Sequence, residues 1–187
     1  LMARAYHSGD SAEIDWILRR FAGIGAPDAP LLAAGVSLGA NALLKWLGEQ
    51  EHAASGILCA AAAVCPPHDL GGVSRHLERG VNRIYTQNFL NTLIPRALAK
   101  SRRFPGVMDD EQIAAAKNLT DYDNFVTAPV HGFRDAADYY AQATAKPLLM
   151  AINVPTLILN AANDPFVPPE FLPTQREVSG LVQLDIQ

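Results

Sequence analysis

A serine lies between two glycines in the segment Gly35-Val36-Ser37-Leu38-Gly39, where an apolar run gives way to a helical pattern. Residues 31–36 are continuously apolar, which predicts a strand buried on both faces, and residues 40–46 carry helix formers with leucines on one side. A serine at such a strand–turn–helix junction holds its hydroxyl at the end of the strand, where a substrate can reach it. We therefore predict a nucleophile elbow, with Ser37 as the catalytic nucleophile, rather than a chance turn.

The residues beside the serine have separate tasks in this interpretation. Gly35 and Gly39 let backbone segments approach closely around a strained serine, where Cβ atoms would clash. The amide of Leu38 opens the following helix and would point at the oxyanion that develops during attack. Losing one such donor typically costs about 3 to 4 kcal/mol of transition-state stabilisation.

A serine hydroxyl is a poor nucleophile until a base removes its proton, so a histidine and an orienting carboxylate are required. Asp164 is the favoured acid, because it follows the apolar run Val154–Asn160, which predicts a strand, and because Pro165 keeps it out of helical geometry. Two alternatives stay open. Asp164 could form an ordinary Asp-Pro turn, and Asp69 follows another apolar run, although Leu70-Gly71-Gly72 after it indicates a turn more simply.

The expected chain order is serine, then acid, then histidine, and no histidine of this sequence follows Asp164. We interpret His7 and His52 as solvated or capping residues. His68 and His76 are expected at the entry of a helical region, and His131 is expected in a loop between helices. The expectation is that the base lies beyond Gln187 and that this chain alone is inactive.

The apolar pattern predicts an α/β fold. Strands are expected over residues 31–36, 56–64, 154–160 and 181–186, and strands separated by helices indicate a parallel sheet covered on both faces. A first helix should begin at a capping box formed by Asp10 and Glu13 and stop at Gly23 and Gly25. A further helix is expected over residues 169–179.

Residues 69–150 show no strand pattern and are far too long for an ordinary connection, which predicts a helical cap inserted between two strands. The expected organisation is a hydrolase-like core in residues 1–68, the cap, and the rest of the core in 151–187. Helices are predicted over 110–117, over 135–145 and around one broad apolar face, which is formed by Ile84, Leu90, Leu93, Ile94 and Leu98.

The segment Arg75–Arg103 holds seven basic residues and one acid, Glu78, so it is locally +6 although the whole chain is −4. The basic residues are Arg75, Arg79, Arg83, Arg96, Lys100, Arg102 and Arg103. Two interpretations stay open: a solvated helix face, or a patch that approaches an anionic lipid surface or an acidic substrate.

Composition excludes several classes of protein. With 187 residues and 49% hydrophobic content, the chain can bury the core of one domain or a large part of one. A pI near 5.7 gives no overall basic field for nucleic acid, and no uncharged run reaches the roughly 20 apolar residues that cross a bilayer. We expect neither a nucleic-acid partner nor a transmembrane helix.

Cys59 and Cys65 lie in or beside an alanine-rich run with no histidine at metal-ligand spacing, which predicts buried free thiols and no metal site. Free thiols and the lack of a signal-peptide pattern fit a reducing compartment, so a cytoplasmic location is expected, with contact to a membrane surface if the basic patch binds lipid. The chain opens with Leu1 rather than Met, and we expect a fragment of a longer protein.

Four segments together are similar to the α/β-hydrolases of the YheT-like esterase family, which is related to the lipid-acting α/β-hydrolase-domain proteins of animals. They are RAYHSGDSAEID (Arg4–Asp15), GVSLGANALLKWLGE (Gly35–Glu49), VTAPVHGFRDAADYYAQA (Val126–Ala143) and VPTLILNAANDPFVP (Val154–Pro168). The resemblance covers nearly the whole chain and is more specific than the serine motif alone.

The resemblance implies a partial α/β-hydrolase fold, with Ser37 as nucleophile, Asp164 as triad acid and Leu38 as an oxyanion-hole amide. It implies hydrolysis of carboxylic esters with medium-chain or lipid-like acyl groups and no cofactor. An acyltransferase that uses alcohols and a non-catalytic scaffold with a basic cap stay open as alternatives. The family's histidine-glycine oxyanion loop is expected before Leu1, since His131-Gly132 follows the nucleophile and cannot replace it.

Overall fold

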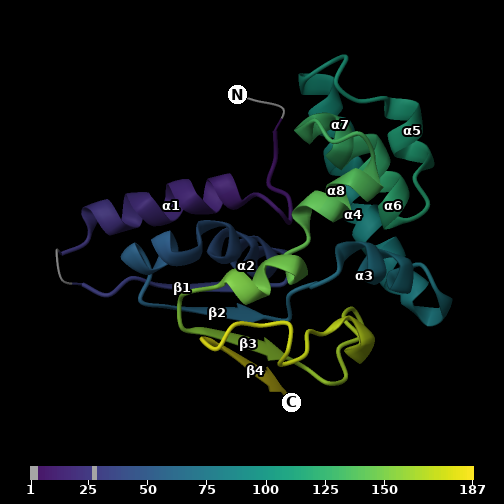
Figure 1. Cartoon of the computed structure of the whole chain (residues 1–187). Helices are drawn as coiled ribbons and strands as arrows, with labels where there is room; N and C mark the ends of the chain where they lie inside the picture. Colours follow the sequence, from purple (N-terminus) through teal and green to yellow (C-terminus); the bar gives the residue numbers. More distant parts are fainter. Residues whose placement is uncertain (1–3, 27–28) are drawn as a thin grey trace. The chain divides into compact units, whose positions relative to one another are not determined.

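The computed structural model describes residues 4–26 and 29–187 (Figure 1). The chain divides into two compact units. One, here called the sheet unit, comprises His7–Asp69 and Ala143–Gln187, and the other, the helical unit, comprises Leu70–Gln142 with the described residues before His7.

The sheet unit contains four parallel strands in the order β1-β2-β3-β4, as the sequence predicts. Their bounds are β1 Leu32–Val36, β2 Ala60–Val64, β3 Thr156–Asn160 and β4 Val182–Ile186. The register pairs Val36 with Val64 and Val64 with Leu159, so neighbouring strands end together at one edge of the sheet. This edge carries the turn at Ser37.

The helical elements of the sheet unit are α1 (Ser11–Ile24), α2 (Leu38–Gln50) and three 3-10 turns. The turns are η1 (Glu51–Gly56), η4 (Lys146–Ala151) and η5 (Pro169–Phe171). Asp10 caps α1 as predicted, since its carboxylate accepts a hydrogen bond from the amide of Glu13 at 3.4 Å.

The core of the sheet unit forms where α2 packs on the strands. Leu44, Trp46 and Leu47 of α2 are fully buried, and they share one apolar cluster with Leu58 and Ile158. Figure 1 shows α1 and α2 on the same side of the sheet. This cluster fixes α2, and with it the turn that begins α2.

Strand β1 is not buried on both faces, which corrects the prediction made from its apolar run. Leu32 and Val36 are 65% and 67% exposed, because alternate residues of a strand point to opposite faces and only one face of β1 lies against α2. The helix predicted over residues 169–179 is also wrong beyond the single turn η5. Pro173 has no amide hydrogen for a helix, and Glu177 instead folds back to accept a hydrogen bond from the amide of Thr174 at 2.8 Å.

The helical unit contains α3 (Leu70–Leu77), η2 (Gly80–Asn82), α4 (Arg83–Arg103), α5 (Asp110–Ala115) and α6 (Leu119–Tyr122). A π-helical turn η3 (Asp123–Thr127), α7 (Ala128–His131) and α8 (Ala136–Ala143), whose last residue belongs to the sheet unit, follow. Ala97, Ile113 and Val126 form its buried apolar cluster.

Three local predictions in this part of the chain are wrong. Leu70-Gly71-Gly72 begins helix α3 instead of forming a turn, and His131 ends α7 instead of lying in a loop. The sequence predicts Ile84 on the apolar face of α4, but it is 65% exposed. Two residues of an α-helix turn by about 200°, so Ile84 lies nearly opposite Thr86, the first buried residue of α4.

The cysteines are free, as predicted, but they are not buried. Cys59 is exposed and Cys65 is half-buried, because both flank strand β2 instead of lying within it.

Candidate active site

Ser37 occupies the turn between β1 and α2, and its backbone is strained. Its φ is 52°, a left-handed conformation that non-glycine residues seldom adopt. Its amide donates to the carbonyl oxygen of Val64 at 2.9 Å, and its carbonyl oxygen accepts from the amides of Ala40 and Asn41. Ser37 is exposed, and its side chain makes no capping hydrogen bond to α2, so the hydroxyl is not used to cap the helix.

Gly35 makes room for this turn. A Cβ atom at Gly35 would lie 2.6 Å from the carbonyl oxygen of Gly39 and 2.7 Å from the Cα of Ala40. Both atoms belong to the backbone at the start of α2, so neither can move without opening the turn. The close approach of Gly35 and Gly39 that the sequence suggests is therefore present in the fold.

The amide of Leu38 belongs to the first turn of α2, where no earlier carbonyl of the helix can accept a hydrogen bond. Leu38 is 43% exposed, so the turn around its amide is open to solvent. The backbone dipoles of the helix favour negative charge at this end. An oxyanion formed beside Ser37 would meet favourable electrostatics here.

Asn41 is a buried anchor of this turn that the sequence analysis missed. Its Nδ2 donates to the carbonyl and hydroxyl oxygens of Ser8 and to the carbonyl of Ala143, at 2.8 to 3.0 Å. Its Oδ1 accepts from the amide of Ala145 at 3.0 Å. An asparagine one helical turn after the serine was the only sequence signal, because its partners lie 33 and 102 residues away.

Asp164 lies in the loop that follows β3, at the same edge of the sheet as Ser37, with β2 between the two strands. Its Oδ1 accepts from the amides of Phe166 at 2.8 Å and Val167 at 3.4 Å. These bonds hold the half-buried carboxylate within its own loop. The structure thus places Asp164 at the edge where the sequence analysis expects the triad acid.

His68 is the histidine nearest in sequence to the end of β2, and it is completely buried. Its Nε2 lies 3.3 Å from Oδ1 of Asn160. Among the described residues, neither Nδ1 of His68 nor Nδ2 of Asn160 has a hydrogen-bond partner. Burial lowers the pKa of His68 to about 4, partly opposed by the bond to Asn160. A histidine so enclosed cannot exchange protons with a substrate at the surface.

The other histidines have local roles or positions. Nδ1 of His7 accepts from the amide of Gly9 at 3.1 Å, and Nε2 of His76 lies 2.8 Å from Nδ2 of Asn82. His52 is exposed in η1, and His131 ends α7.

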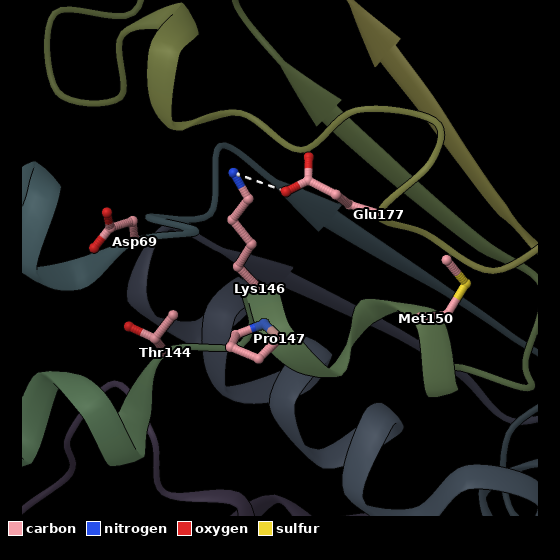
Figure 2. A pocket seen from close by; sticks show the side chains of 6 residues that line it. All are labelled: Asp69, Thr144, Lys146, Pro147, Met150 and Glu177. Atoms are coloured by element: carbon pink, nitrogen blue, oxygen red, sulfur yellow. Dashed lines mark ion pairs between the residues drawn. The ribbon is translucent and has the colours of Figure 1, made fainter.

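A cavity of about 480 Å³ opens in the sheet unit between Asp69, which lies in the segment after β2, and η4. Lys146 and Glu177 form an ion pair across it at 3.4 Å (Figure 2). Lys146 also donates a hydrogen bond to the carbonyl of Leu172. Asp69, Thr144, Pro147 and Met150 complete the lining. Asp69, the rival acid of the sequence analysis, therefore lines this cavity, to which neither Ser37 nor Asp164 contributes.

Within residues 4–26 and 29–187, no cluster of three or more histidine, cysteine, aspartate or glutamate side chains could hold a metal ion. In the same residues, every helix is too short or too polar to cross a bilayer.

Comparison with known families gives a match over most of the chain. The family described as serine aminopeptidase, S33, matches residues 15–176. Among curated proteins, the chain is 37% identical to "Putative esterase YheT" of Escherichia coli and 31% identical to "Phospholipase ABHD3" of Mus musculus. Each alignment covers 94% of this chain, but 53% of the first protein and 42% of the second. The chain thus spans about half the length of these relatives.

Solved structures agree on the fold. The esterase LipA of Xanthomonas oryzae, described as rice cell wall degrading, has a TM-score of 0.53 at 20% identity. That match covers 97% of this chain and 59% of LipA. Similarity at this level of identity supports an α/β-hydrolase fold and nothing finer.

Proposed function

The chain belongs to the α/β-hydrolase family described as serine aminopeptidase, S33, and from this premise we propose that it carries the nucleophile of a serine esterase. The proposed substrates are carboxylic esters with medium-chain or lipid-like acyl groups. The names of the relatives, an esterase and a phospholipase, favour esters over peptides. The observation that carries the proposal is the exposed, left-handed Ser37 at the junction of β1 and α2.

In the proposed reaction, the Ser37 hydroxyl attacks the ester carbonyl while a histidine accepts its proton. The amide of Leu38 donates a hydrogen bond to the oxyanion of the tetrahedral intermediate. When the intermediate collapses, the histidine returns the proton to the departing alcohol and the acyl group stays on Ser37. Water then attacks the acyl-enzyme by the same route and releases the acid. Asp164 would orient the histidine and stabilise its cationic form.

The base in this proposal is a histidine that follows Asp164 in the full-length protein, outside the 187 residues of this sequence. His68 is not the base in this proposal, because its side chain is completely buried. The remaining four histidines precede Asp164 in the chain, against the serine–acid–histidine order of this fold.

A fluorophosphonate probe, which phosphonylates activated serines, tests the proposal in the full-length protein. We expect labelling of the wild type and none of Ser37→Ala, with Ser55→Ala as a matched control because Ser55 is an exposed serine of η1. Asp164→Asn should label more slowly. The 187-residue chain should label at least about a thousandfold more slowly, because its base is missing.

Two results would contradict the proposal. Equal labelling of wild type and Ser37→Ala would assign the nucleophile to another residue. A full-length protein that neither labels nor hydrolyses p-nitrophenyl esters of any acyl length would favour a non-catalytic scaffold.

A further inference from the structure

An apolar patch is exposed on the helical unit at η2 and the first half of α4. Val81 and Ile84 are 79% and 65% exposed, and Phe89 and Tyr85 are 41% and 37% exposed. Large apolar side chains scattered singly over a surface need no explanation, but four exposed within nine residues of the chain do. We call these four residues the apolar patch.

The patch lies on the outer face of α4. Ile84, Tyr85 and Phe89 lie within about 140° of one another around the helix axis. The residues that pack into the helical unit are Thr86, Leu90, Ala97 and Ser101, which lie on the opposite face of the same helix. The core of the unit therefore uses one face of α4 and leaves the patch on the other.

Basic residues precede and follow the patch in the sequence. Arg79 and Arg83 flank Val81, and both are exposed. Arg96 and Arg103 follow Phe89 at intervals of seven residues, which places them along the same face of α4, and they are exposed too. Arg102 lies beside them. The outer face of α4 thus begins with apolar residues and ends with arginines.

Glu78 and Asp109, two acids near this face in the sequence, accept hydrogen bonds within the helical unit. Glu78, the only acid between Arg75 and Arg103, is half-buried and accepts a 2.6 Å hydrogen bond from the hydroxyl of Thr120. Asp109, Asp110 and Glu111 lie at the start of α5, where Asp109 accepts from the amides of Glu111 and Gln112. These three acids belong to the N-terminus of another helix, α5.

We propose that this face of η2 and α4 docks on the surface of an anionic lipid membrane. The apolar patch would enter the boundary between headgroups and acyl chains, and the arginines would meet lipid phosphates and carboxylates. Charge complementarity favours this partner, because the segment from Val81 to Arg103 carries five basic residues and no acid, which matches an anionic bilayer. The inference goes beyond the proposed esterase and holds whichever reaction the protein catalyses.

The test is co-sedimentation of the chain with vesicles of phosphatidylcholine alone or of equimolar phosphatidylcholine and phosphatidylserine. We expect binding to the anionic vesicles and little to the neutral ones. Ile84→Asn/Phe89→Asn should lower the partition coefficient by about tenfold per side chain. Arg102→Gln/Arg103→Gln should lower it by about fivefold per charge, an effect that disappears at about 1 M salt, where the Debye length is about 3 Å.

Matched controls come from the sheet unit. Phe21→Asn/Ile24→Asn removes one phenylalanine and one isoleucine of α1 that are 54% and 68% exposed, and Arg20→Gln/Arg176→Gln removes two exposed arginines. Neither pair should change vesicle binding. All eight substituted positions are exposed, and circular dichroism verifies that each variant is folded.

Three outcomes would overturn the inference. The first is equal binding to neutral and anionic vesicles. The second is equal loss of binding in the patch variants and the controls. The third is the absence of vesicle binding together with a self-association, seen by analytical ultracentrifugation, that Ile84→Asn/Phe89→Asn removes, which would make the patch a contact between copies of the chain.

Discussion

The amide of Ser37 donates a hydrogen bond to the carbonyl oxygen of Val64, the last residue of the neighbouring strand, at 2.9 Å. The next strand ends in the same way, since the amide of Cys65 donates to the carbonyl of Leu159 at 2.8 Å. Ser37 and Cys65 also share a left-handed backbone, with φ of 52° and 46°. The residue after each of these two strands thus donates one further backbone hydrogen bond to the neighbouring strand. This bond to the sheet helps to hold Ser37 in its strained conformation.

Gly35→Ala should destabilise the sheet unit and disturb Ser37. The added methyl group would lie 2.6 Å from a carbonyl oxygen of the backbone, so β1 and α2 must separate. Overpacking of this kind typically costs about 1 to 3 kcal/mol. Chemical denaturation of the chain measures the loss, and slower fluorophosphonate labelling of the full-length protein would show the effect on Ser37.

Gly23→Ala is the matched control for that substitution. Gly23 lies within α1, and in the part of the chain that the structure describes no atom lies within 4 Å of the place that a Cβ atom would take there. Alanine should stabilise the helix by about 0.5 to 1 kcal/mol relative to glycine. We therefore expect Gly35→Ala to lower the free energy of unfolding and Gly23→Ala to raise it. A stabilising effect of Gly35→Ala would contradict the tight turn.

Asn41→Ala should destabilise the sheet unit more than a surface substitution does. It leaves the carbonyls of Ser8 and Ala143 and the amide of Ala145 buried without their partner. Unsatisfied buried groups cost about 1 to 3 kcal/mol each, although relaxation makes several of them less than additive. We expect a total loss of roughly 3 kcal/mol in the free energy of unfolding.

Asn88→Ala serves as the control for Asn41, because Asn88 is an exposed asparagine of α4. Its effect should stay within about 0.5 kcal/mol. If Asn41→Ala and Asn88→Ala gave the same small change in the free energy of unfolding, the buried hydrogen bonds of Asn41 would not contribute to stability.

The sequence predicts the sheet unit well where a pattern is local. The apolar runs around β1, β3 and β4 and the cap at Asp10 depend on neighbouring residues, and each is found within a few residues of its expected bounds. Exposure of Val36 could not be predicted in this way, because a continuous apolar run does not show which faces of a strand are covered.

The parts that sequence reasoning missed depend on distant contacts. The role of Asn41 appears only when residues 8 and 143 come beside it, and the burial of His68 depends on Asn160, which is 92 residues away. The helix wrongly expected over residues 169–179 shows the opposite error, since the local prolines there outweigh the weak helical pattern. The placement of Ser37 and Asp164 at one edge of the sheet could be predicted, because both follow strands and parallel strands bring their ends to one edge.

His68 should make the sheet unit less stable in acid. Its pKa is about 4 in the folded chain and 6.5 ordinarily, so the unfolded chain binds more protons between these values. The free energy of unfolding should therefore fall as the pH drops from about 6.5 to 4, by on the order of 3 kcal/mol in total. Lys146 strengthens this effect and Glu177 opposes it, while burial remains the main cause.

His68→Gln tests the origin of that dependence. Glutamine does not titrate, so the pH dependence in this range should flatten even if the variant is less stable at neutral pH. Denaturation curves of the wild type and the variant at several pH values measure the difference. An unchanged slope in His68→Gln would assign the acid sensitivity to other groups.

Asp123 should make the helical unit respond to acid with the opposite sign. Burial raises the pKa of this carboxyl from 3.8 to about 6, although hydrogen bonds from Thr127 at 2.5 Å and Tyr140 at 2.7 Å lower it. The folded unit binds more protons than the unfolded chain between pH 3.8 and 6, so its free energy of unfolding should rise as the pH falls through this range, by at most about 3 kcal/mol.

Hydrogen exchange separates the two responses, because amides of α8 and η3 report on the helical unit and amides of β2 and β3 on the sheet unit. Asp123→Asn should abolish the acid stabilisation of the helical unit and raise its stability at pH 7 by about 1 kcal/mol, since asparagine keeps one of the two accepted bonds without a buried charge. Tyr140→Phe removes a hydrogen-bond donor to the Asp123 carboxylate, so it should raise the pKa of Asp123. The pH range in which acid stabilises the helical unit should therefore extend to higher pH. Amides of both units that lose protection together in acid would contradict the assignment to Asp123.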